Sequence, residues 1–469
     1  MTRARMSYTN RDYESMRREL LARVPQLTDR WTDFNTSDLG VVLLELFCGV
    51  GDMLAYYLDA QAGEAFLPTV RQRGNLINLC KLISYRVRGP VAATTELIFT
   101  LQAPLETALV LPAGTLCRAI IDREEIDFAT AEALTIPPGE LSGRVAARQG
   151  RPKVETFTAN GIAGQRLELR GQSIAMGSLH LQAEGEALRE VWHFQESDAS
   201  SPHFLPETDG LDRMTVLLGD GRHGRLLPAG TSIRVEYLET LGTGGNLAPG
   251  LIRSVVTPIM VAGLPVRLAV TNPIAATGGE DPETIDEARR QAPAELRSLW
   301  KAVTKEDYEA LVLGFPGVAK VRVLDRNDCT NIRYYQVNIA VAPAGGGRPS
   351  PLLLQELKAF LETRKVITIE VRLFEPTYRP IDVDAEIFVM AGEDLTLVRT
   401  RSEEAVQDFF SFERVGFGQA VYFSDLVALL DGIAGVSHVR LHHPAADVLL
   451  GQGEIPMLGV LQLDARRAT

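Results

Sequence analysis

The sequence predicts an α+β multidomain protein with an N-terminal helical bundle segment, an antiparallel β domain and two small C-terminal α/β sandwich domains. Three observations lead to this prediction. Apolar residues have helical spacing up to about residue 90, short alternating runs dominate from about 94 to 260, and helical and strand patterns then alternate. The domain boundaries that follow are 1–90, 91–277, 278–376 and 377–469.

The first predicted domain is helical. It begins with MTRARMSYTNRDYESMRREL, a polar segment in which Thr9 and Asp12 predict a capping box. The segment has no apolar core followed by a small-residue cleavage site, so we expect no signal peptide. The first helix is predicted to end at Pro25, and NTSD offers N-caps for a long second helix. A third helix, over roughly 69–84, stops before Pro90.

The segment DLGVVLLELFCGVGDMLAYYLDA, at residues 38–60, has no equal in apolar character elsewhere in the chain. It is long enough to span a bilayer. However, Glu45 and Asp52 lie in its middle, and a central acidic residue costs about 2.5–3.5 kcal/mol on insertion. No positive cluster flanks the segment closely. We therefore expect a helix of a soluble protein, without direct membrane insertion.

Two stripes of residues run along this helix. Acidic residues recur every seven positions, at Glu45, Asp52 and Asp59. Small residues repeat the same step on a neighbouring stripe: Cys48, Ala55 and Ala62. A helix that is apolar nearly all round must be buried nearly all round. Two interpretations stay open, namely a bundle formed partly with other subunits and the central helix of an intramolecular helical domain.

The β domain contains GDGRHG at 219–224, which matches the G-x-G-x-x-G pattern of dinucleotide-binding proteins. In those proteins the third glycine opens a helix whose N-terminus receives the pyrophosphate. Here the strand pattern TSIRVEYLE follows almost at once, and Pro228 and Gly230 oppose a helix in between. The glycines are therefore predicted to shape a tight turn between two strands.

The last third contains a weak internal repeat. EDYEALVLGFPGVAKVRV from Glu306 and SDLVALLDGIAGVSHVRL from Ser424 align without gaps at an offset of 424 − 306 = 118. Each copy predicts a short helix, a glycine turn and a strand, within two antiparallel sheets backed by helices. Asp281 and Thr304 are predicted N-caps of the helices that begin this part. The segment GGGRPSP at 345–351 is predicted to be a mobile loop.

Composition and motifs argue against catalysis and against nucleic-acid binding. The net charge is −12 and no run of Lys and Arg stands out. The seven histidines are scattered, and the sequence contains neither G-x-S-x-G nor H-E-x-x-H. We expect no enzyme and no catalytic, metal or cofactor site. Four cysteines form no C-x-x-C pair and are expected to be reduced and buried: Cys48, Cys80, Cys117 and Cys329.

Four blocks of the sequence occur in an order that resembles a known family. The first is LTDRWTDFNTSDLGVVLLELFCGVGDMLAYYLD, and the second is LLGDGRHGRLLPAG with GTGGNLAPG. The third is GGEDPETIDEARRQAPAELRSLWKAVTKEDYEALVLGFPGVAKVRV, and the fourth is FGQAVYFSDLVALLDGIAGVSHVRL followed by EIPMLGVLQL. In all four the chain is similar to the baseplate J-like family, the baseplate wedge proteins of contractile phage tails and of phage-tail-like contractile injection systems.

The resemblance implies a structural wedge component. In such baseplates two copies join a second wedge protein through an N-terminal helical bundle, and the wedges close into a sixfold ring. C-terminal domains of adjacent copies link the wedges. The implied partners are therefore a second copy, a second wedge protein, the central spike and hub, sheath-proximal proteins and tail fibres, but no nucleic acid. The implied place of assembly is the cytoplasm, in a particle that is then released or attached to a membrane.

The resemblance also points to contact residues. Those of the bundle helix are Leu43, Leu44, Glu45, Leu46, Asp52, Tyr56 and Asp59. Those between C-terminal domains of adjacent wedges are Phe423, Leu426, Leu429 and Val436. We further hypothesise that the acidic stripe sets the register of the bundle or pairs with arginine. Bulkier residues are expected where this chain has Cys48–Gly51, and the difference either permits closer packing or loosens the helix.

The implied mechanism is mechanical, because a baseplate keeps the sheath extended until contact with a target rearranges the ring. Rigid domains with hinges are therefore expected, and the candidate hinges lie near 89–94, 242–250 and 271–280. No long inserted domain is expected. The alternative function is a stand-alone tail accessory protein that binds carbohydrate or another cell-wall ligand through its β domain.

Overall fold

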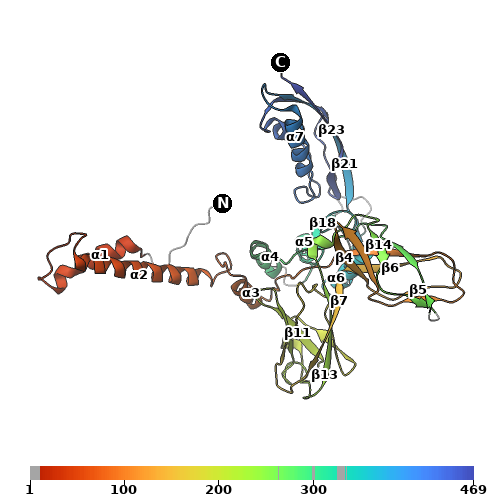
Figure 1. Ribbon diagram of the computed structural model, residues 1–469, viewed down its shortest axis with the longest axis horizontal. Coiled ribbons are helices and arrows are strands. Elements are labelled where there is room, and N and C mark those ends of the chain that lie inside the picture. The colour runs from red at the N-terminus through yellow and green to blue at the C-terminus, as the bar shows by residue number, and fades with distance from the viewer. Residues whose placement is uncertain (1–10, 262–263, 298–300, 325–332, 334, 469) are drawn as a thin grey trace. The chain divides into compact units, whose positions relative to one another are not determined.

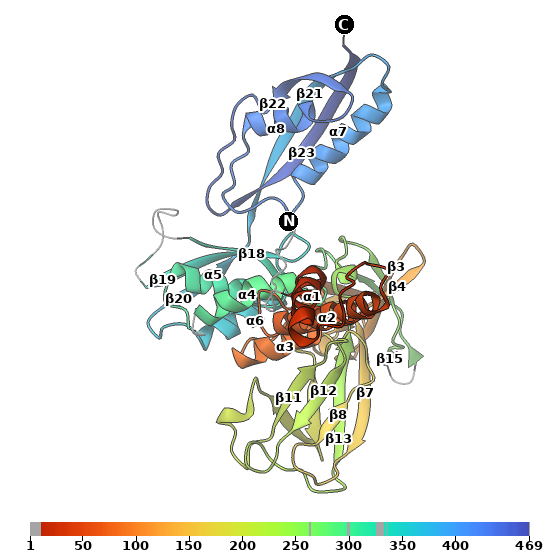
Figure 2. The ribbon, with the colours of Figure 1, turned by 90° about the vertical axis from the view of Figure 1, so that its left-hand side faces the viewer.

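A computed structural model describes residues 11–261, 264–297, 301–324, 333 and 335–468 (Figures 1 and 2). The chain divides into two units. The first comprises Met1–Val87, Thr208–Leu211 and Thr284–Pro293, and the second comprises Arg88–Glu207, Asp212–Glu283 and Ala294–Thr469. Helices dominate the N-terminal segment, and sheets with helices follow, so the predicted α+β multidomain class is confirmed.

The first unit contains the N-terminal helices α1 (Tyr13–Leu27), α2 (Leu39–Gly63) and α3 (Arg73–Leu82). Asp12 is the N-cap of α1, since its carboxylate accepts the Ser15 N–H and its own N–H donates to the Ser15 hydroxyl. The capping box therefore starts at Asp12, whereas the predicted Thr9 lies outside the described residues. α1 also continues through Pro25, beyond its predicted end.

The first part of α4 (Ile285–Arg297) completes this helical unit. Ala288 and Ala292 share a buried cluster with Leu76 and Cys80 of α3. The helix is capped by Thr284, which exchanges hydrogen bonds with Glu287, and not by the predicted Asp281. The unit therefore takes a helix from the region that was predicted to begin the third domain at residue 278.

The first β module consists of residues 94–149 and 252–271. Its six-stranded sheet has the order β14-β3-β4-β6-β1-β17, with antiparallel pairs throughout. Asn272 is fully buried and its side chain accepts the Ile252 N–H, which brings the two edge strands together. The strands of the sheet and of two small ribbons beside it are β1 (Thr94–Leu101), β2 (Leu109–Leu111), β3 (Leu116–Ile121), β4 (Glu124–Thr130), β5 (Leu134–Ile136), β6 (Ser142–Gln149), β14 (Ile252–Val255), β15 (Met260–Val261), β16 (Leu264–Pro265) and β17 (Leu268–Thr271).

An inserted β module, residues 151–240, separates β6 from β14. Its seven-stranded sheet has the order β7-β13-β9-β10-β11-β12-β8, and its only parallel pair among the described registers is β10 with β11. The region predicted as one β-rich domain, 91–277, therefore contains two sheets, one of them inserted within the chain of the other. Its strands and short 3₁₀ helix are β7 (Arg151–Thr158), β8 (Arg166–Glu168), β9 (His180–Ala183), β10 (Glu186–Glu190), η1 (Phe194–Glu196), β11 (His203–Thr208), β12 (Met214–Leu218) and β13 (Ser232–Glu239).

The inserted module leaves and rejoins the first β module at one place. The buried Gln149 side chain accepts the Thr240 hydroxyl (2.6 Å) and the Leu241 N–H (2.9 Å). Beside it, the carboxylate of Asp127, only 4% exposed, receives Arg118 from β3 and Arg151 from β7. Burial acts to raise the pKa of Asp127, but the two guanidinium groups outweigh it and hold that pKa below its usual value.

The three segments predicted as hinges, near 89–94, 242–250 and 271–280, lie against one another. β-Bridges join the first segment to the third. The Asn246 side chain donates to the Gly279 carbonyl (2.9 Å) and accepts the Gly279 N–H (2.8 Å). This part of the chain, which includes the 3₁₀ helix η2 (Gly242–Gly245), therefore forms one cross-linked junction and not three hinges, contrary to the prediction.

The loop 345–351, predicted to be mobile, is anchored on two sides. Its three glycines all have positive φ (80°, 76° and 75°), a conformation that side chains resist. A Cβ on Gly345 would lie 3.0 Å from the side chain of Asn246, and one on Gly346 would lie 3.3 Å from the ring of Phe412. The loop thus contacts both the junction and the C-terminal domain.

The two copies of the internal repeat form the predicted helix, glycine turn and strand. They are α5 (Lys305–Leu313) with β18 (Val318–Leu324), and α8 (Phe423–Asp431) with β22 (Val436–His443). The equivalent turn glycines Gly317 and Gly435 both have positive φ. Thr304 forms the predicted capping box with Asp307.

Each copy lies at the edge of a three-stranded sheet, antiparallel to a central strand that pairs in parallel with the third. Both sheets are therefore mixed, whereas antiparallel sheets were predicted. The first also contains β19 (Gln336–Pro343), α6 (Pro351–Glu362) and β20 (Glu370–Phe374). The second also contains β21 (Thr377–Val389), α7 (Leu395–Phe409) and β23 (Glu454–Arg467), and Figure 2 shows α7 and α8 beside it.

Candidate assembly surfaces and a cavity in the inserted module

α1 folds back along α2 in the first unit (Figure 1). The Arg17 guanidinium forms an ion pair with the Glu45 carboxylate at 2.8 Å. A Cβ on Gly51 would lie 2.8 Å from the sulfur of Met16, whereas nothing lies within 4 Å of a Cβ on Gly49. The small residues of this segment therefore permit closer packing at Gly51 and leave open space at Gly49.

Trp31 fixes the start of α2. Its indole N–H donates to the Asp33 carbonyl (2.8 Å) and to the carboxylate of Asp38 (3.0 Å). Asp38 is the N-cap of α2 and accepts the N–H groups of Gly40 and Val41. A Cβ on Gly40 would lie 2.5 Å from the Trp31 ring. The W-T-D and D-L-G segments therefore act together as one helix-start motif.

Both predicted stripes lie on the less exposed side of α2. Cys48 and Ala55 are buried, and all three acidic residues are half-buried. The half-buried set includes four of the predicted contact residues: Leu44, Glu45, Asp52 and Asp59. The arginine that pairs with Glu45 belongs to the same chain. Glu45 of the acidic stripe thus contacts α1, and the role of the stripe in a bundle stays a prediction.

The opposite side of α2 is apolar and exposed. It includes the other three predicted contact residues, Leu43, Leu46 and Tyr56. The large exposed side chains of this face are Leu39, Val42, Leu43, Leu46, Phe47, Val50, Met53, Leu54, Tyr56, Tyr57 and Leu58. We call them the α2 apolar face. Burial within the chain covers only 17% of the most apolar part of the helix, so an intramolecular core helix is not what the structure shows.

The α2 apolar face has the spacing of a coiled coil. Steps of four and three residues alternate along it through Leu39, Leu43, Leu46, Val50, Met53, Tyr57 and Ala60. This spacing is the heptad pattern by which helices pack side by side. The sequence prediction followed the seven-residue step of the acidic residues and missed this seam, although the same residues contain it. By length and composition alone, α2 could also cross a membrane.

The predicted contact residues of the C-terminal domain have a different environment. Leu426 and Val436 are buried in the core of their own domain, at 0% and 3% exposed. Phe423 and Leu429 are half-buried against the same core. Leu426 and Val436 are therefore core residues of their own domain, and a role of these four residues between adjacent wedges stays a prediction.

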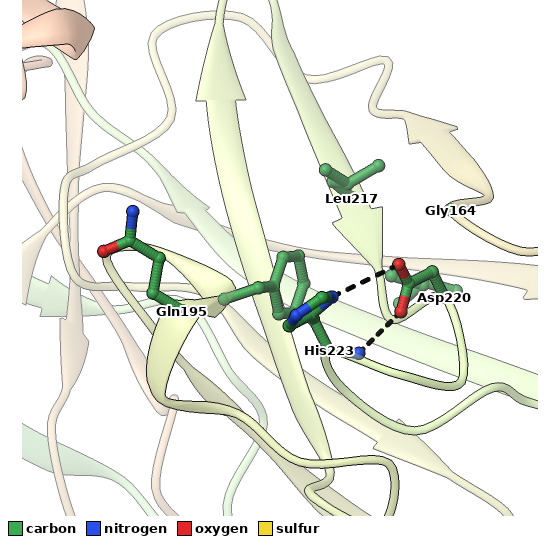
Figure 3. A pocket seen from close by; sticks show the side chains of 7 residues that line it. Gly164, Gln195, Leu217, Asp220 and His223 are labelled. Atoms are coloured by element: carbon green, nitrogen blue, oxygen red, sulfur yellow. Dashed lines mark hydrogen bonds and ion pairs between the residues drawn. The ribbon is translucent and has the colours of Figure 1, made fainter.

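The GDGRHG segment forms the predicted tight turn (Figure 3). Gly219 and Gly224 are in contact, since a Cβ on Gly219 would lie 2.2 Å from the Gly224 backbone, and Gly221 has φ of 84°. The Asp220 carboxylate accepts the backbone N–H groups of Arg222 (2.8 Å) and His223 (2.6 Å). The hydrogen bond from His223, and then that from Arg222, lowers the pKa of Asp220.

A cavity of about 450 Å³ lies beside this turn. Its lining includes Phe194, Gln195 and Leu217 as well as Asp220 and His223. Figure 3 shows Asp220 paired with His223, and Oδ2 of Asp220 lies 3.6 Å from Nδ1 of His223. The sequence prediction excluded a nucleotide here but gave no sign of a cavity, because Phe194 and Gln195 come from a distant segment.

Among the described residues, no group of three or more His, Cys, Asp or Glu side chains could bind a metal ion. Cys48, Cys80 and Cys117 are buried free thiols, as predicted, and Cys329 lies outside the described residues. Burial raises the pKa of the Cys117 thiol to about 12, which keeps it protonated and unreactive.

Comparison with known proteins identifies both ends of the chain. A family model described as "Bacteriophage baseplate protein, N-terminal domain" matches residues 12–82. A second, described as "Baseplate J-like protein C-terminal domain", matches residues 381–463. The resemblance predicted from the sequence is confirmed in these two segments, which include α2 and the sheet of β21, β22 and β23.

A solved structure of the anti-feeding prophage baseplate, determined by electron cryomicroscopy with sixfold symmetry, also matches. The alignment covers 98% of this chain and 92% of that chain, at 16% sequence identity and a TM-score of 0.35. No curated protein matches the chain.

Proposed function

We propose that this baseplate protein, with a phage baseplate N-terminal domain and a baseplate J-like C-terminal domain, is the structural wedge component of a contractile phage tail-like particle. The observation that carries the proposal is the α2 apolar face. It lies within the matched N-terminal segment, it has heptad spacing, and its side chains are exposed in the part of the chain that the structure describes. Exposed apolar surface of this extent marks an interaction site.

The proposed occupant of the α2 apolar face is a helical bundle with a second copy of the chain and a second wedge protein. A heptad seam packs against other helices by inserting each apolar side chain between four residues of a neighbour. The open space at Gly49 lets such a neighbour approach closely. Because the face extends well beyond the narrow seam of a two-helix coil, more than one partner helix is needed to cover it.

A membrane is a poorer occupant of the same face. The half-buried Glu45 and Asp52 lie near the middle of α2, and each costs about 2.5–3.5 kcal/mol at the centre of a bilayer. Moreover, α1 lies along α2 and carries Arg17, Arg18 and Glu19. Insertion of α2 would take these charges into the lipid as well.

In the proposed assembly the wedges close into a sixfold ring around the spike and hub, and the ring keeps the sheath extended until a target is contacted. The chain contributes rigid parts and interfaces, with no catalytic step. The cross-linked junction suits this role, because it transmits force between the modules that it joins. The particle is assembled in the cytoplasm, and tail fibres, spike and sheath-proximal proteins are the remaining proposed neighbours.

The test is incorporation into particles in the native host. A tagged chain is purified under mild conditions, its size is measured by sedimentation and the eluate is viewed by negative stain. We expect sheath and tube proteins to accompany the native chain in megadalton particles. Leu43→Asp with Leu46→Asp, which changes two exposed residues of the α2 apolar face, should leave the chain folded by circular dichroism but free of particles.

A matched control is Leu211→Asp with Leu241→Asp, because these leucines are as exposed as the first pair and lie outside α2. The control should enter particles normally. If the native chain elutes alone from a host that makes such particles, or if the α2 variant is incorporated as well as the control, the proposal fails. The first result would favour the stand-alone accessory protein.

A further inference from the structure

The cavity of the inserted β module lies at the end of the module that is remote from its connections to the first β module. Strands β7 and β13 pair from Arg151 with Glu239, beside the connections, to Thr158 with Ser232 at the other end. Gly164 follows the far end of β7, and its N–H donates to the Gly219 carbonyl. The cavity therefore opens where the insertion is free of the chain that supports it.

The GDGRHG turn, which contributes Asp220 and His223 to the lining of the cavity, is supported by a second turn at 198–201. The Asp198 carboxylate accepts the hydroxyl groups of Ser200 and Ser201, both at 2.8 Å, and the hydrogen bond from Ser200, followed by that from Ser201, lowers the pKa of Asp198 to about 2. This turn is joined to GDGRHG by the Gly224 N–H, which donates to the Asp198 carbonyl at 2.9 Å. The turn that carries Asp220 is thus held in place before any ligand arrives.

From this geometry we propose that the cavity binds a neutral carbohydrate, such as one residue of a surface glycan. Sugar rings present C–H faces and hydroxyl edges. The lining offers both complements: the half-buried Phe194 and Leu217 for the apolar face, and the exposed side chains of Gln195, Asp220 and His223 for hydroxyl groups. The volume of about 450 Å³ is within the usual range for small-molecule sites.

Other ligand classes fit the cavity less well. Among the described residues that line it there is no Lys or Arg, so a phosphate or sulfate group would meet the Asp220 carboxylate without a compensating cation. The nearby Arg225 is engaged with Glu186 at 2.8 Å. Among the described side chains, two potential metal ligands face each other, Asp220 and His223, which is too few for a metal site.

The proposal does not depend on assembly through α2, and its test uses the purified full chain without particles. The chain is applied to an array of neutral and acidic oligosaccharides, and the best neutral one is then titrated by calorimetry. We expect Gln195→Ala and His223→Ala each to weaken binding about five- to tenfold, because each removes one hydrogen bond to the sugar. Both side chains are exposed, so neither change should disturb folding.

Arg222→Ala is the matched control, because Arg222 lies in the same turn as His223 but does not line the cavity. It should bind as the native chain does. The proposal is overturned if no glycan on the array binds, if only acidic glycans bind, or if the two cavity variants bind as tightly as the control. Retained incorporation of those variants into particles would show that the two proposals are separate.

Discussion

The N-terminal and C-terminal segments use similar apolar residues in opposite ways. In the C-terminal domain, Leu426 is fully buried between α8 and the sheet. On α2, Leu46 is 63% exposed. Both belong to apolar helices that were predicted to contact partners. The C-terminal helix has a sheet of its own chain to cover it, whereas among the described residues of its unit α2 packs along α1, so the first builds a core and the second offers a surface.

Apolar content alone therefore does not separate a core helix from an interface helix. What separates them is how much of the circumference the chain can cover. α8 has its apolar residues on one side, at Leu426 and Leu430, and one sheet suffices. α2 is apolar on more than half of its circumference, and its narrow polar stripe is half-buried. An exposed apolar helix surface of this kind predicts a partner that covers it.

The largest expected effect is a difference in stability between a variant of the C-terminal core and a variant of the α2 apolar face. Leu426→Ala should destabilise the C-terminal domain by about 2–5 kcal/mol, because it leaves a cavity in a closed core. Leu46→Ala should change the stability of the free chain by less than about 0.5 kcal/mol, because its side chain is exposed. Hydrogen exchange of peptides from each segment measures both. Equal loss of protection in the two segments would mean that the α2 apolar face is covered in the free chain.

A smaller effect is expected at the root of the inserted module. Asp127→Asn removes the charge between Arg118 and Arg151 and should cost about 1–3 kcal/mol. Since the pKa of Asp127 is lowered on folding, its contribution is complete above about pH 4 and is lost as the pH falls through the folded value.

The measurement for Asp127 is urea unfolding at pH 7 and at pH 3, followed by hydrogen exchange in β4 and β7. The native chain should lose stability in β4 and β7 when the pH is lowered from 7 to 3, and the Asp127→Asn variant should lose less. α1 and α2 do not contact this carboxylate and serve as the internal control. A native chain whose β4 and β7 are equally protected at both pH values would contradict the assignment.

Alanine substitutions at two glycines of α2 are expected to change stability by a similar or smaller amount. They compare a covered position with an open one within the same helix. Gly40→Ala should destabilise the α1–α2 hairpin by about 1–3 kcal/mol, because the new Cβ would meet the Trp31 ring. Gly49→Ala should be neutral or stabilising by up to about 1 kcal/mol, through helix propensity in open space. Tryptophan fluorescence during unfolding reports on both. Equal destabilisation by the two changes would exclude the Trp31 contact as the cause.

The smallest expected effect concerns the acidic stripe. Glu45→Ala removes a half-exposed ion pair with Arg17 and should cost less than about 1 kcal/mol, and less again at high salt. Exchange of α1 amides with and without added salt measures it. If Glu45→Ala leaves α1 unchanged but prevents incorporation into particles, the acidic stripe has a direct role in the bundle, as was hypothesised from its spacing.

Local features were the most predictable part of this chain. The capping box at Thr304, the tight turn at GDGRHG and the two repeat copies follow from short segments whose geometry depends on nearby residues. The parallel pairing of β19 with β20 and of β21 with β23 was missed. Pairing depends on strands far apart in the chain, and alternation along one strand does not reveal its neighbour.

The larger errors share a cause. Gly/Pro segments such as 242–250 were predicted to bend, and the GGG loop was predicted to move. In the structure, glycine instead allows close approach of backbones, as between Gly279 and the Gly242 carbonyl. The cavity was missed because the residues that line it are far apart in the sequence. Phe194 and His223 come together only when two separate turns are joined by a backbone hydrogen bond.

The connection at Gln149 has a consequence for how such proteins diversify. The inserted module begins and ends beside this one side chain, and it contacts the chain that supports it at few other places, such as the Met176 N–H, which donates to the Pro90 carbonyl. Domains whose termini lie together can be exchanged, lengthened or deleted with little disturbance to their host. A graft of a foreign β domain between Gln149 and Leu241 would keep both matched segments unaltered, so the same particle could be given a new recognition element at a single splice site.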